Sequence, residues 1–369
     1  MKICYLADAI SIHTQRWVKY FADKGHKVHL ISLTPLGDGD IGNTELYVLK
    51  KFRLQIRILS LLINLLSDVI QVRKLMKKIK PDILHAHYIT DYGFWGALSG
   101  FHPFVLSAWG SDILVNPRES RILRYFVQFA LKRADLITTE GENAIEEMIR
   151  LSSDPDKINL ILHGVDTRKF SPKDKSLDEE HRAFDSPTVI STRNLTPIYD
   201  LETLIRSVPL VLKQIPEVKF IIAGNGAQEN YLKDLAKSLN VLDSITFIGQ
   251  IPHEELPHHL RAANVYVSTS LSDTISESLM EAMACGLAPV VTNVGDNKKW
   301  IANGENGFII PVKRPDLLAE KIIYLLNNEE LRQKMGRANW QLIEERVDYK
   351  KEMDKMERLY EELIRRSKG

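Results

Sequence analysis

Short runs of apolar residues alternate along the chain with longer segments of helical periodicity. Many of the runs are almost continuously apolar, as expected for parallel strands that helices cover on both faces. Regular alternation of strand and helix predicts an α/β fold with a doubly wound parallel sheet, and the pattern occurs once in each half of the chain. The predicted strands of the first half are Lys2–Ala7, Lys27–Leu33, Leu46–Leu49, Asp82–Ala86, Phe104–Ala108, Asp135–Thr138 and Asn159–Leu162. Those of the second half are Thr188–Ser191, Lys219–Ala223, Ile245–Ile248, Val265–Ser268, Pro289–Thr292 and Phe308–Ile310.

A polar and charged segment bracketed by two prolines separates the halves, SPKDKSLDEEHRAFDSP over 171–187. We predict one Rossmann-like domain over 1–170, a linker over 171–187 and a second Rossmann-like domain over 188–345. Residues 346–369 are predicted to form a helix that packs back towards the N-terminal domain. Ligands of open α/β sheets bind beyond the carboxyl ends of the strands, so two such domains are expected to face a central cleft.

Composition indicates a globular protein and says little about its partners. Apolar residues make up 44% and charged residues 26% of the 369 residues. Lys and Arg number 49 against 48 Asp and Glu, so the net charge gives no sign of nucleic-acid binding. The two cysteines, Cys4 and Cys285, lie far apart in apolar stretches, which favours buried free thiols in a reducing compartment over a zinc site.

No segment of the sequence has the pattern of a targeting signal or a membrane span. The N-terminal stretch MKICYLADA is too short in its apolar part for a signal peptide. The longest apolar stretch, Ile58–Leu66, is interrupted by Ser60 and Asn64, whereas a span requires about twenty apolar residues. We therefore expect a cytoplasmic protein.

The stretch SDTISESLMEAMACG places three carboxylates, Asp273, Glu277 and Glu281, at four-residue intervals. A strand precedes it, and Ser276 is a good N-cap, so a helix is predicted to begin there and to end at Gly286. Its first N–H groups would form an anion site beyond the strand end. Acids in a first helical turn also simply suit the helix dipole, but that does not explain Glu281, which is followed by a segment built for close packing.

The longer stretch SDTISESLMEAMACGLAPVVT resembles the signature of family 4 glycosyltransferases, which are retaining enzymes of the GT-B fold. The family pattern has a Glu, seven residues, a second Glu, and then Ala-Met-Ala-x-Gly-x-Pro-Val-Val. The second Glu matches Glu281, and the first matches Asp273, which is shorter by one methylene but still a carboxylate. The resemblance implies a GT-B protein whose N-terminal domain lies on the acceptor side and whose C-terminal domain binds the nucleotide sugar.

The resemblance also implies roles for this stretch. Asp273 would hold hydroxyls of the donor sugar, Glu281 the ribose, and the backbone around Ile275, Ser276 and Glu277 the diphosphate and sugar. Glu277 stands where the family usually has an apolar residue, and a side chain facing the diphosphate would repel it. We therefore predict that Glu277 points aside, towards a sugar hydroxyl, the acceptor or solvent. The expected catalytic residues are Asp273, Arg193 and Glu277.

Arg193 lies in the stretch STRNLTPIYDLETLI, which resembles the family's Gly-Arg-Leu-x-x-x-Lys-Gly segment. It matches the arginine that clamps the diphosphate, and a guanidinium is a good bidentate ligand for phosphate. Tyr199 replaces the lysine that usually joins this arginine. Lys298 or Lys299, beyond another strand of the same domain, could supply the missing positive charge.

Two further stretches resemble the nucleotide pocket of the family. IIAGNGAQENYL is a strand, a Gly-x-Gly turn and a helix, which is weak evidence alone because any such turn can require glycine. In the family this loop, here Gly224, Asn225 and Gly226, lines the nucleotide. ITFIGQIPHEEL matches a family segment whose backbone reads the base, here at Gln250 and Ile251.

The N-terminal domain offers candidates for acceptor binding. The usual Gly-Gly pair of the first loop is replaced by SIHTQRW, so His13 and Arg16 are candidates either for acceptor contact or for a structural role. His85 and His87 lie two residues apart at a strand end and share a face. A third metal ligand is missing nearby, so acceptor or phosphate contact is the preferred interpretation.

Two loop segments of this domain depart from the family. Relatives often have His-Gly-x-Asp after a strand, and this chain has Trp109, Gly110, Ser111 and Asp112. The donor-sugar role of that histidine is therefore not assigned to Trp109. Both Trp109 and Asp112 remain candidates on the acceptor side. Asp112 would either serve the acceptor or orient the loop. In ILHGVDTRKFSP, His163 replaces the usual Asn, and Asp166 and Thr167 are expected to fix the hinge.

No metal or cofactor is expected besides the nucleotide-sugar co-substrate. The sequence Asp38-Gly39-Asp40 resembles the Asp-x-Asp metal site of the other glycosyltransferase fold, but it lies in a loop of the wrong architecture. Three histidines, His253, His258 and His259, lack the usual ligand spacing on one helix face, so a polar loop is preferred. Enzymes of this type are generally metal-independent, because helix N–H groups and cations replace the metal.

The segment Lys50–Lys80 is basic at both ends and apolar in its middle. Two interpretations remain open. It could lie on an anionic membrane as a peripheral contact at the inner face, or it could form one or two core helices with solvated charges. The many family members that glycosylate lipid-linked acceptors add weight to the membrane interpretation without deciding between the two.

The expected function is that of a retaining glycosyltransferase of glycan or polysaccharide biosynthesis, using a nucleotide-diphosphate sugar, with UDP preferred, and a saccharide or lipid-linked acceptor. One alternative is a GT-B epimerase or phosphorylase acting on similar sugars. The other is a non-catalytic sugar-nucleotide binder, suggested by the missing lysine and histidine. A dinucleotide dehydrogenase is disfavoured, because no full Gly-x-Gly-x-x-Gly follows the first strand of either half.

Overall fold

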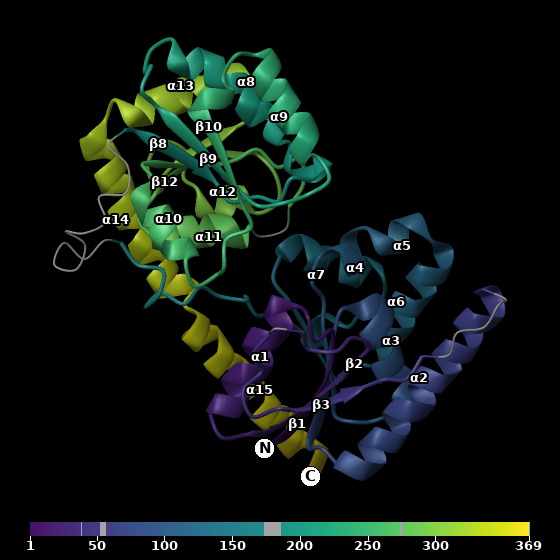
Figure 1. Ribbon diagram of the computed structural model, residues 1–369. Coiled ribbons are helices and arrows are strands. Elements are labelled where there is room, and N and C mark those ends of the chain that lie inside the picture. The colour runs from purple at the N-terminus through teal and green to yellow at the C-terminus, as the bar shows by residue number, and fades with distance from the viewer. Residues whose placement is uncertain (38, 52–56, 173–185, 274–275, 369) are drawn as a thin grey trace. The chain divides into compact units, whose positions relative to one another are not determined.

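The chain forms two compact units, each with its own sheet and core (Figure 1). Unit 1 comprises Met1–His163 and Lys351–Gly369, and unit 2 comprises Gly164–Lys350. The structure is a computed structural model that describes residues 1–37, 39–51, 57–172, 186–273 and 276–368, with 57–62 described by their helical backbone alone. Most of the predicted linker 171–187, together with Ile275 and Asp38, therefore lies outside the described residues.

The sheet of unit 1 has seven strands, all paired in parallel, in the order β3-β2-β1-β4-β5-β6-β7. Its central strands are buried on both faces by helices, which explains their continuously apolar sequences. The strands are β1 (Lys2–Leu6), β2 (Lys27–Ser32), β3 (Glu45–Val48), β4 (Ile83–His87), β5 (Phe104–Ser107), β6 (Leu136–Thr139) and β7 (Ile158–Leu160). The helices are α1 (Ile12–Asp23), α2 (Arg57–Ile79), α3 (Phe94–Ser99), α4 (Ser111–Leu114), α5 (Asn116–Glu119), α6 (Arg121–Arg133) and α7 (Glu142–Arg150).

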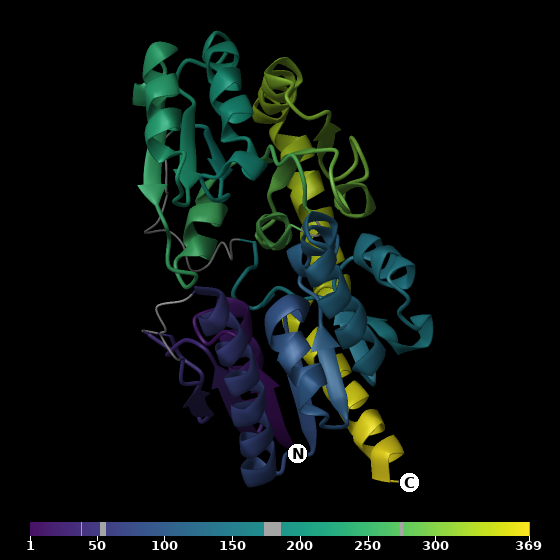
Figure 2. The same ribbon diagram turned by 90° about the vertical axis from the view of Figure 1, so that its right-hand side faces the viewer.

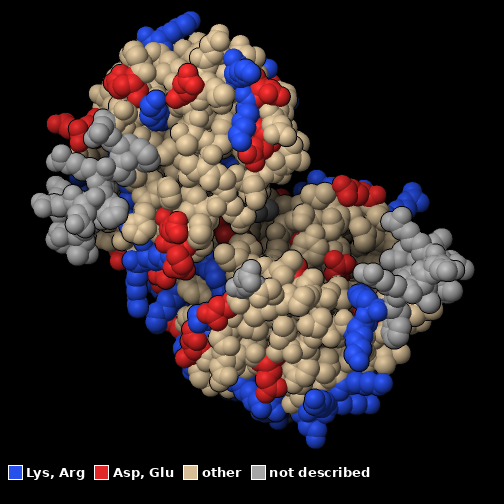
Figure 3. Space-filling model, viewed as in Figure 1, with Lys and Arg blue, Asp and Glu red and all other residues tan. Residues whose placement is uncertain are grey.

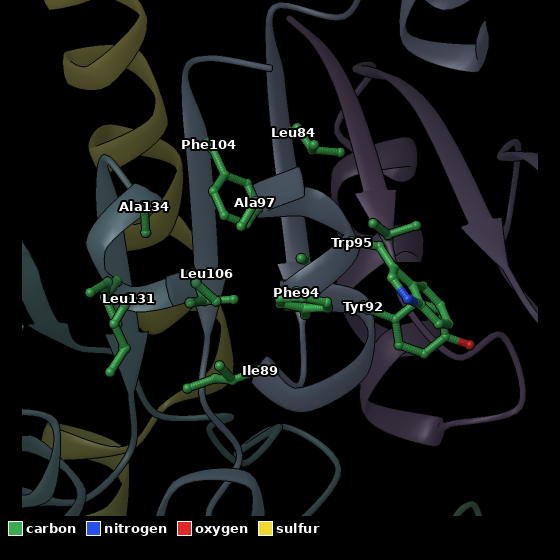
Figure 4. Packing of buried hydrophobic residues seen from close by; sticks show 14 of the residues in the cluster. Leu84, Ile89, Tyr92, Phe94, Trp95, Ala97, Phe104, Leu106, Leu131 and Ala134 are labelled. Atoms are coloured by element: carbon green, nitrogen blue, oxygen red, sulfur yellow. The ribbon is translucent and has the colours of Figure 1, made fainter. Parts of the chain in front are cut away.

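The core of unit 1 is a close packing of aliphatic and aromatic side chains between the sheet and its helices. Phe94 and Ala97 of α3 lie over the side chains of Leu106 and Phe104 from β5 (Figure 4). Trp95 packs edge-on against Tyr92, with ring centroids 5.3 Å apart. Burial of such side chains from water is the main favourable term for this unit.

The sheet of unit 2 has six parallel strands in the order β10-β9-β8-β11-β12-β13. The thirteen strands predicted for the two sheets are all present, with ends within two residues of those expected. The strands are β8 (Thr188–Ser191), β9 (Lys219–Ala223), β10 (Ile245–Gly249), β11 (Val265–Ser268), β12 (Ala288–Thr292) and β13 (Phe308–Ile310). The helices are α8 (Leu201–Leu212), α9 (Glu229–Ser238), α10 (Leu256–Ala262), α11 (Glu277–Ala284), α12 (Asn297–Trp300), α13 (Pro315–Leu326) and α14 (Glu329–Arg346).

The order of strands fixes where each sheet can hold a ligand. In unit 2 the order reverses between β8 and β11, and in unit 1 between β1 and β4. Loops that leave the carboxyl ends of the two strands at such a point run to opposite sides and leave a ligand site between them. The segments that carry Arg193 and Asp273 follow β8 and β11, so they meet at the switch point of unit 2.

The C-terminal helix α15 (Tyr349–Lys368) returns to unit 1 and runs along it (Figures 1 and 2). Its residues Met353, Met356 and Tyr360 are fully buried. The Tyr360 hydroxyl lies 3.1 Å from the hydroxyl of Tyr5 and 2.5 Å from Nδ1 of His85. The last helix of the chain therefore completes the core of the first unit.

Cys4 and Cys285 are buried free thiols, as predicted. Burial raises the pKa of both groups, which keeps them as neutral thiols and apolar packing elements. Among the described residues, no helix combines the length and the apolar character that crossing a bilayer requires.

Candidate active site

Arg193 is the centre of a hydrogen-bonded group at the switch point of unit 2. Its Nη2 donates to Oδ2 of Asp273 at 2.6 Å, and its Nη1 lies 2.8 Å from the hydroxyl oxygens of both Ser276 and Ser278. Ser276 also caps helix α11, because its hydroxyl oxygen accepts a hydrogen bond from the backbone N–H of Leu279. The arginine thus joins the predicted sugar ligand Asp273 to the start of the helix.

Arg193 is 8% exposed, and its guanidinium is covered on one side by Tyr199. The guanidinium carbon lies 4.0 Å from the centroid of the tyrosine ring, which is the distance of a cation–π contact. Of the five N–H donors of an arginine, those at Nε and one at Nη2 have no partner among the described residues. The tyrosine that replaces the expected lysine therefore supplies a face that orients the arginine.

The glycine-rich loop after β9 packs directly against the segment that carries Arg193. Gly224 has a φ of +146°, and a Cβ at this position would lie 2.7 Å from the carbonyl oxygen of Arg193. The Gly224 N–H donates to the carbonyl of Gly249 at 2.7 Å, and Nδ2 of Asn225 donates to Oε1 of Gln250 at 3.2 Å. The predicted pocket loops, including Gly226 and Ile251 beside them, therefore lie next to one another at the strand ends.

Glu281 lies on helix α11 one turn beyond Glu277, and it is 8% exposed. Its Oε1 lies 2.8 Å from Nε2 of His253, which comes from the loop after β10. Glu277 is the first residue of α11 and is half-buried. Asp273 and Glu281 therefore have different partners: Asp273 contacts Arg193, and Glu281 contacts His253.

Lys298 and Lys299, the candidates for the missing positive charge, are exposed on helix α12. Lys299 pairs with Asp296, at 3.2 Å between Nζ and Oδ1. Their participation in donor binding stays a prediction.

His258 and His259 lie on α10, where Nδ1 of His258 lies 3.3 Å from Nη2 of Arg261.

Unit 1 brings four of the residues singled out in the sequence together as a cluster of rings, His13, His87, Trp109 and His163. His13 stacks on His163 with centroids 4.4 Å apart, and Trp109 lies 4.8 Å from His87 and 5.3 Å from His163. His163 is held by Glu140, whose carboxylate contacts its Nδ1 and accepts its backbone N–H at 2.8 Å. We call this group the histidine–tryptophan cluster.

His87 is the most buried member of the cluster, with 1% of its surface exposed. Neither of its ring nitrogens has a hydrogen-bond partner among the described residues. Burial, together with the neighbouring His85, His163 and His13, holds the pKa of His87 well below its ordinary value. His87 is therefore a neutral imidazole at physiological pH.

His85 and Asp112 have structural surroundings that leave no surface for an acceptor. His85 is fully buried, and its Nδ1 and Nε2 contact Tyr360 and Ser107 at 2.5 and 2.6 Å. Burial lowers the pKa of His85 to about 3. The Asp112 carboxylate is also fully buried and accepts hydrogen bonds from the backbone of Ile89 and Trp109 at 2.8 and 3.0 Å. The acceptor contact predicted for these two residues is therefore wrong. Of the two roles considered for Asp112, the structure supports the second, in which Asp112 orients the loop.

Burial and hydrogen bonding act against each other on Asp112. Burial raises the pKa of its carboxyl and the backbone N–H donors of Ile89 and Trp109 lower it by less, so that the pKa is raised to about 6. Arg16 lies three residues after His13 on α1 and is half-buried.

The hydroxyl of Thr167 donates a hydrogen bond to Oδ2 of Asp348 at 2.6 Å, which joins the segment that enters unit 2 to the one that leaves it.

Comparison with known families identifies both halves of the chain. Residues 173–341 match the family described as glycosyl transferases group 1, and residues 2–141 match the family described as glycosyl transferase 4-like. The chain is a glycosyltransferase with a group 1 domain over 173–341. The resemblance found in SDTISESLMEAMACGLAPVVT is thereby confirmed at the level of the family.

Two named relatives of this glycosyltransferase are distant in sequence. N-acetyl-alpha-D-glucosaminyl L-malate synthase of Bacillus anthracis is 23% identical over 295 residues, covering 78% of this chain and 76% of its own. A UDP-Gal:alpha-D-GlcNAc-diphosphoundecaprenol alpha-1,3-galactosyltransferase of Escherichia coli is 27% identical over 286 residues, covering 73% of each chain. These relatives are glycosyltransferases, which agrees with the predicted class of enzyme.

A solved structure confirms the fold of this glycosyltransferase. The Anabaena protein HepE, solved in complex with UDP-glucose, superposes with a TM-score of 0.81 at 17% sequence identity. The match covers 98% of this chain and all of the other. The predicted GT-B fold, with two Rossmann-like domains, is thus confirmed.

Two groups that shape the site of this glycosyltransferase were not found from the sequence. The predicted polar-loop role of His253 did not include its contact with Glu281, which lies 28 residues further along the chain. The sequence gives no indication of a role for Ser278. Its hydroxyl oxygen accepts hydrogen bonds from Nη1 of Arg193 and from the hydroxyl of Tyr266, both at 2.8 Å. Neither contact leaves a local signal, since each joins residues from separate strand ends.

Proposed function

We propose that this glycosyltransferase moves a sugar from a UDP-sugar to a saccharide or lipid-linked acceptor with retention of anomeric configuration. The observation that carries the proposal is the group formed by Arg193, Asp273 and Ser276 at the start of helix α11. It brings an arginine, a carboxylate and a capped helix N-terminus to the switch point of one sheet. This combination suits a ligand that has both phosphate charge and sugar hydroxyls.

Each part of the donor has a proposed partner in unit 2. The unpaired N–H donors of Arg193 and the first backbone N–H groups of α11 would hold the diphosphate, because they concentrate positive charge at one point. Asp273 would accept hydrogen bonds from the sugar hydroxyls, and Glu281 from the ribose. The backbone of Gln250 and Ile251, beside the Gly224–Gly226 loop, would read the base.

The proposed reaction occurs on one face of the sugar. The bond between C1 and the leaving phosphate oxygen breaks, and a bond from C1 to the acceptor oxygen forms on the same face. The proton of the acceptor hydroxyl goes to the leaving phosphate, so the enzyme needs no nucleophile of its own. A retaining hydrolase, by contrast, needs two carboxyl groups about 5 Å apart across the bond. The protein then contributes positioning and charge stabilisation.

The proposal needs no metal or cofactor. Positive charge for the leaving nucleotide would come from Arg193 and the helix N-terminus, with Lys298 or Lys299 as further candidates. The name of the HepE structure, which includes UDP-glucose, and that of the galactosyltransferase of E. coli, which includes UDP-Gal, support UDP as the nucleotide.

The acceptor is proposed to approach the histidine–tryptophan cluster of unit 1. Trp109 and His13 are half-buried, so they combine an accessible part with an aromatic surface of the kind that packs against sugar rings. The neutral His87 behind them has two nitrogens without partners among the described residues. Arg16, on the same helix as His13, is the proposed cation for an acidic or phosphorylated acceptor.

We further propose that helix α2 contacts an anionic membrane when the acceptor is lipid-linked. Leu66 and Ile70 of α2 are 65% and 50% exposed, whereas Val69, Val72 and Met76 are buried in the core of unit 1. Basic residues follow the exposed aliphatic ones, and Lys and Arg side chains gather over the lower end of α2 on the face seen in Figure 3. Exposed aliphatic and basic groups on one helix suit a membrane interface. The acceptor in the name of the E. coli relative, a diphosphoundecaprenol, supports this proposal.

A screen of nucleoside diphosphates by thermal shift tests the donor site. We expect UDP to raise the melting temperature more than GDP or ADP, because binding to the folded state alone stabilises it by mass action. Glu281→Ala is expected to reduce the shift strongly while leaving weak UDP binding, since the carboxylate that would hold the ribose is removed but the proposed diphosphate and base contacts remain. Glu277→Ala should keep the shift and change turnover. Glu305→Ala is the control, because Glu305 is exposed and belongs to the same unit.

The result has clear alternatives. No shift with any of the three nucleotides or their sugars would contradict the donor site. An unchanged shift in Glu281→Ala would remove the ribose role from Glu281 alone. Product analysis by NMR then decides the stereochemistry, and inversion at C1 would exclude the same-face reaction.

A further inference from the structure

Glu281 is a buried carboxylate whose one hydrogen-bond partner among the described residues is an imidazole. Its Oε1 lies 2.8 Å from Nε2 of His253, and its Oε2 accepts no hydrogen bond from a described residue. A carboxylate on a helix has three flexible torsions, so a single fixed contact decides which way the second oxygen faces.

The protonation of His253 follows from its other neighbour. Nζ of Lys169 lies 3.3 Å from Nδ1 of His253. An ammonium group can only donate, so Nδ1 must be the acceptor and carry no proton. The proton of the neutral ring is therefore on Nε2, from which it is donated to Oε1 of Glu281.

Lys169 is itself held in place. Its ammonium lies 2.7 Å from Oε1 of Glu254, and its carbonyl oxygen accepts a hydrogen bond from Nη1 of Arg261 at 3.2 Å. The ring of Phe170 packs against that of His253 with centroids 5.1 Å apart. The imidazole is thus fixed on both its edge and its face by the segment that precedes the predicted linker.

We propose that His253 is a positioning residue for nucleotide binding, which orients Glu281 so that Oε2 is presented to the ribose. Lys169 sets the tautomer that makes this possible. The inference rests on the proposed donor site and adds to it a residue that touches no part of the donor. In effect, the order of contacts is Lys169 to His253, His253 to Glu281, and Glu281 to a ribose hydroxyl.

Two substitutions of His253 separate its hydrogen bond from its bulk. His253→Gln keeps an amide N–H donor near the position of Nε2, whereas His253→Leu keeps a similar volume without a donor. We expect calorimetry to show that His253→Leu weakens UDP binding about tenfold, the order of a lost charge-assisted hydrogen bond. His253→Gln should stay within about twofold of the wild type.

Two readouts distinguish positioning from a merely structural role. In a Glu281→Ala background, His253→Leu should have no further effect on UDP binding, because its target carboxylate is gone. The wild type should prefer UDP over its 2′,3′-dideoxy analogue, and His253→Leu should lose that preference. His258→Leu is the matched control, since His258 lies five residues away and contacts Arg261.

The failures of the two proposals are distinguishable. If the wild type bound no nucleoside diphosphate, both the donor site and the inference on His253 would fall. If it bound UDP but His253→Leu weakened UDP and the dideoxy analogue equally, or weakened UDP further in the Glu281→Ala background, only the positioning role would be overturned. Full retention of UDP affinity in His253→Leu would have the same meaning.

Discussion

Arg193 and Asp273 show how single residues can prepare a site before a ligand arrives. Their side chains are 9% and 14% exposed and are joined at 2.6 Å. In such surroundings an unpaired charge is costly, so each residue keeps the other in one orientation. A diphosphate would then meet an arginine that already has a fixed direction, and less conformational entropy is lost on binding.

The two histidines at the end of β4 lead to opposite predictions. His85→Leu should lower the free energy of unfolding by about 1–3 kcal/mol at pH 8, because Ser107 and Tyr360 lose their partner inside the core. His87→Leu should be close to neutral at pH 8, because it removes no hydrogen bond from a described residue. Urea denaturation at pH 5 and pH 8 measures both effects.

The pH dependence of the His87 variant has a definite sign. The pKa of His87 is lowered by burial in the folded state, so below about pH 6.5 the unfolded chain binds a proton that the folded one does not. Stability is therefore present at high pH and is lost as the pH falls. His87→Leu should remove about 1.4 kcal/mol of this loss per pH unit between pH 6.5 and pH 5. An equal loss in the variant and the wild type would mean that folded His87 is protonated.

Residue identities could be predicted better than residue pairings. The sequence indicated that Arg193, Asp273 and Glu281 belong together, because a motif records chemical types at fixed spacing. It did not indicate that Asp273 would pair with Arg193, 80 residues earlier, or that Glu281 would pair with His253. Such contacts depend on which strands become neighbours, and that is settled by packing across the whole sheet.

Helix α2 packs into the core, and its membrane contact stays a prediction. The sequence left open a core helix or a membrane contact, and the structure shows a helix whose one side is packed into unit 1. The opposite side retains Ile63, Leu66 and Ile70, which are spaced by three and four residues and are 36%, 65% and 50% exposed. Burial of one stripe explains why periodicity predicted the helix, and the second stripe has no packing role among the described residues.

The membrane contact of α2 can be tested on that exposed stripe. The double substitution Leu66→Ser and Ile70→Ser should reduce cosedimentation with vesicles of phosphatidylcholine and phosphatidylglycerol about tenfold or more, because aliphatic surface is lost from the interface. Binding of the wild type should also weaken with salt, since each basic residue near the surface contributes about 1 kcal/mol. Both substitutions are at exposed positions and should change stability little.

Tyr324→Ser is the matched control for this experiment, because Tyr324 is 48% exposed and belongs to unit 2. It should leave vesicle binding unchanged. Equal cosedimentation of the wild type with and without phosphatidylglycerol, or of the α2 variant and the wild type, would contradict the membrane contact.

The helices and strands were the features of this structure that the sequence predicted best. Strands such as β12 were found because buried parallel strands are continuously apolar, and α11 because Ser276 marks its start. Their order in the sheets followed from the alternation with helices. The surroundings of α2 were not predictable, because a stripe of exposed aliphatic residues and a stripe of buried ones have the same period.

On the scale of the whole molecule, the chain contains two separate cores. One is formed by residues of unit 1, including Leu84 and Phe104, and the other by residues of unit 2, including Phe220 and Val290. Each is large enough to unfold as a cooperative unit. Ligands and substitutions are therefore expected to act on one unit at a time.

The substitution Tyr360→Phe tests this separation. It removes the hydroxyl that contacts the buried Tyr5 hydroxyl and Nδ1 of His85, so the unfolding transition of unit 1 should lose about 1–3 kcal/mol. The affinity for UDP and the transition of unit 2 should not change. Denaturation followed with and without UDP separates the two transitions, since UDP should raise only that of unit 2.

Tyr324→Phe is the control, because its side chain is exposed on unit 2. A loss of UDP affinity in Tyr360→Phe, or a single transition that UDP shifts as a whole, would contradict independent units. The separation itself could be predicted from the repeated strand pattern. The contacts of Tyr360 with Tyr5 and His85 could not be predicted. The sequence of an amphipathic helix indicates which of its faces is buried, but it does not indicate which residues that face packs against.

The return of α15 to unit 1 has a consequence for the order in which the protein is made. Residues near the N-terminus leave the ribosome first, but the side chains that complete their core, Met353, Met356 and Tyr360, are synthesised last. Unit 2 lies wholly between them and can fold during translation. Unit 1 must instead wait, with part of its apolar surface uncovered, until the final helix is released. Chains that end before Tyr349 therefore contain nearly all of unit 2 beside an unfinished unit 1 that chaperones are suited to protect.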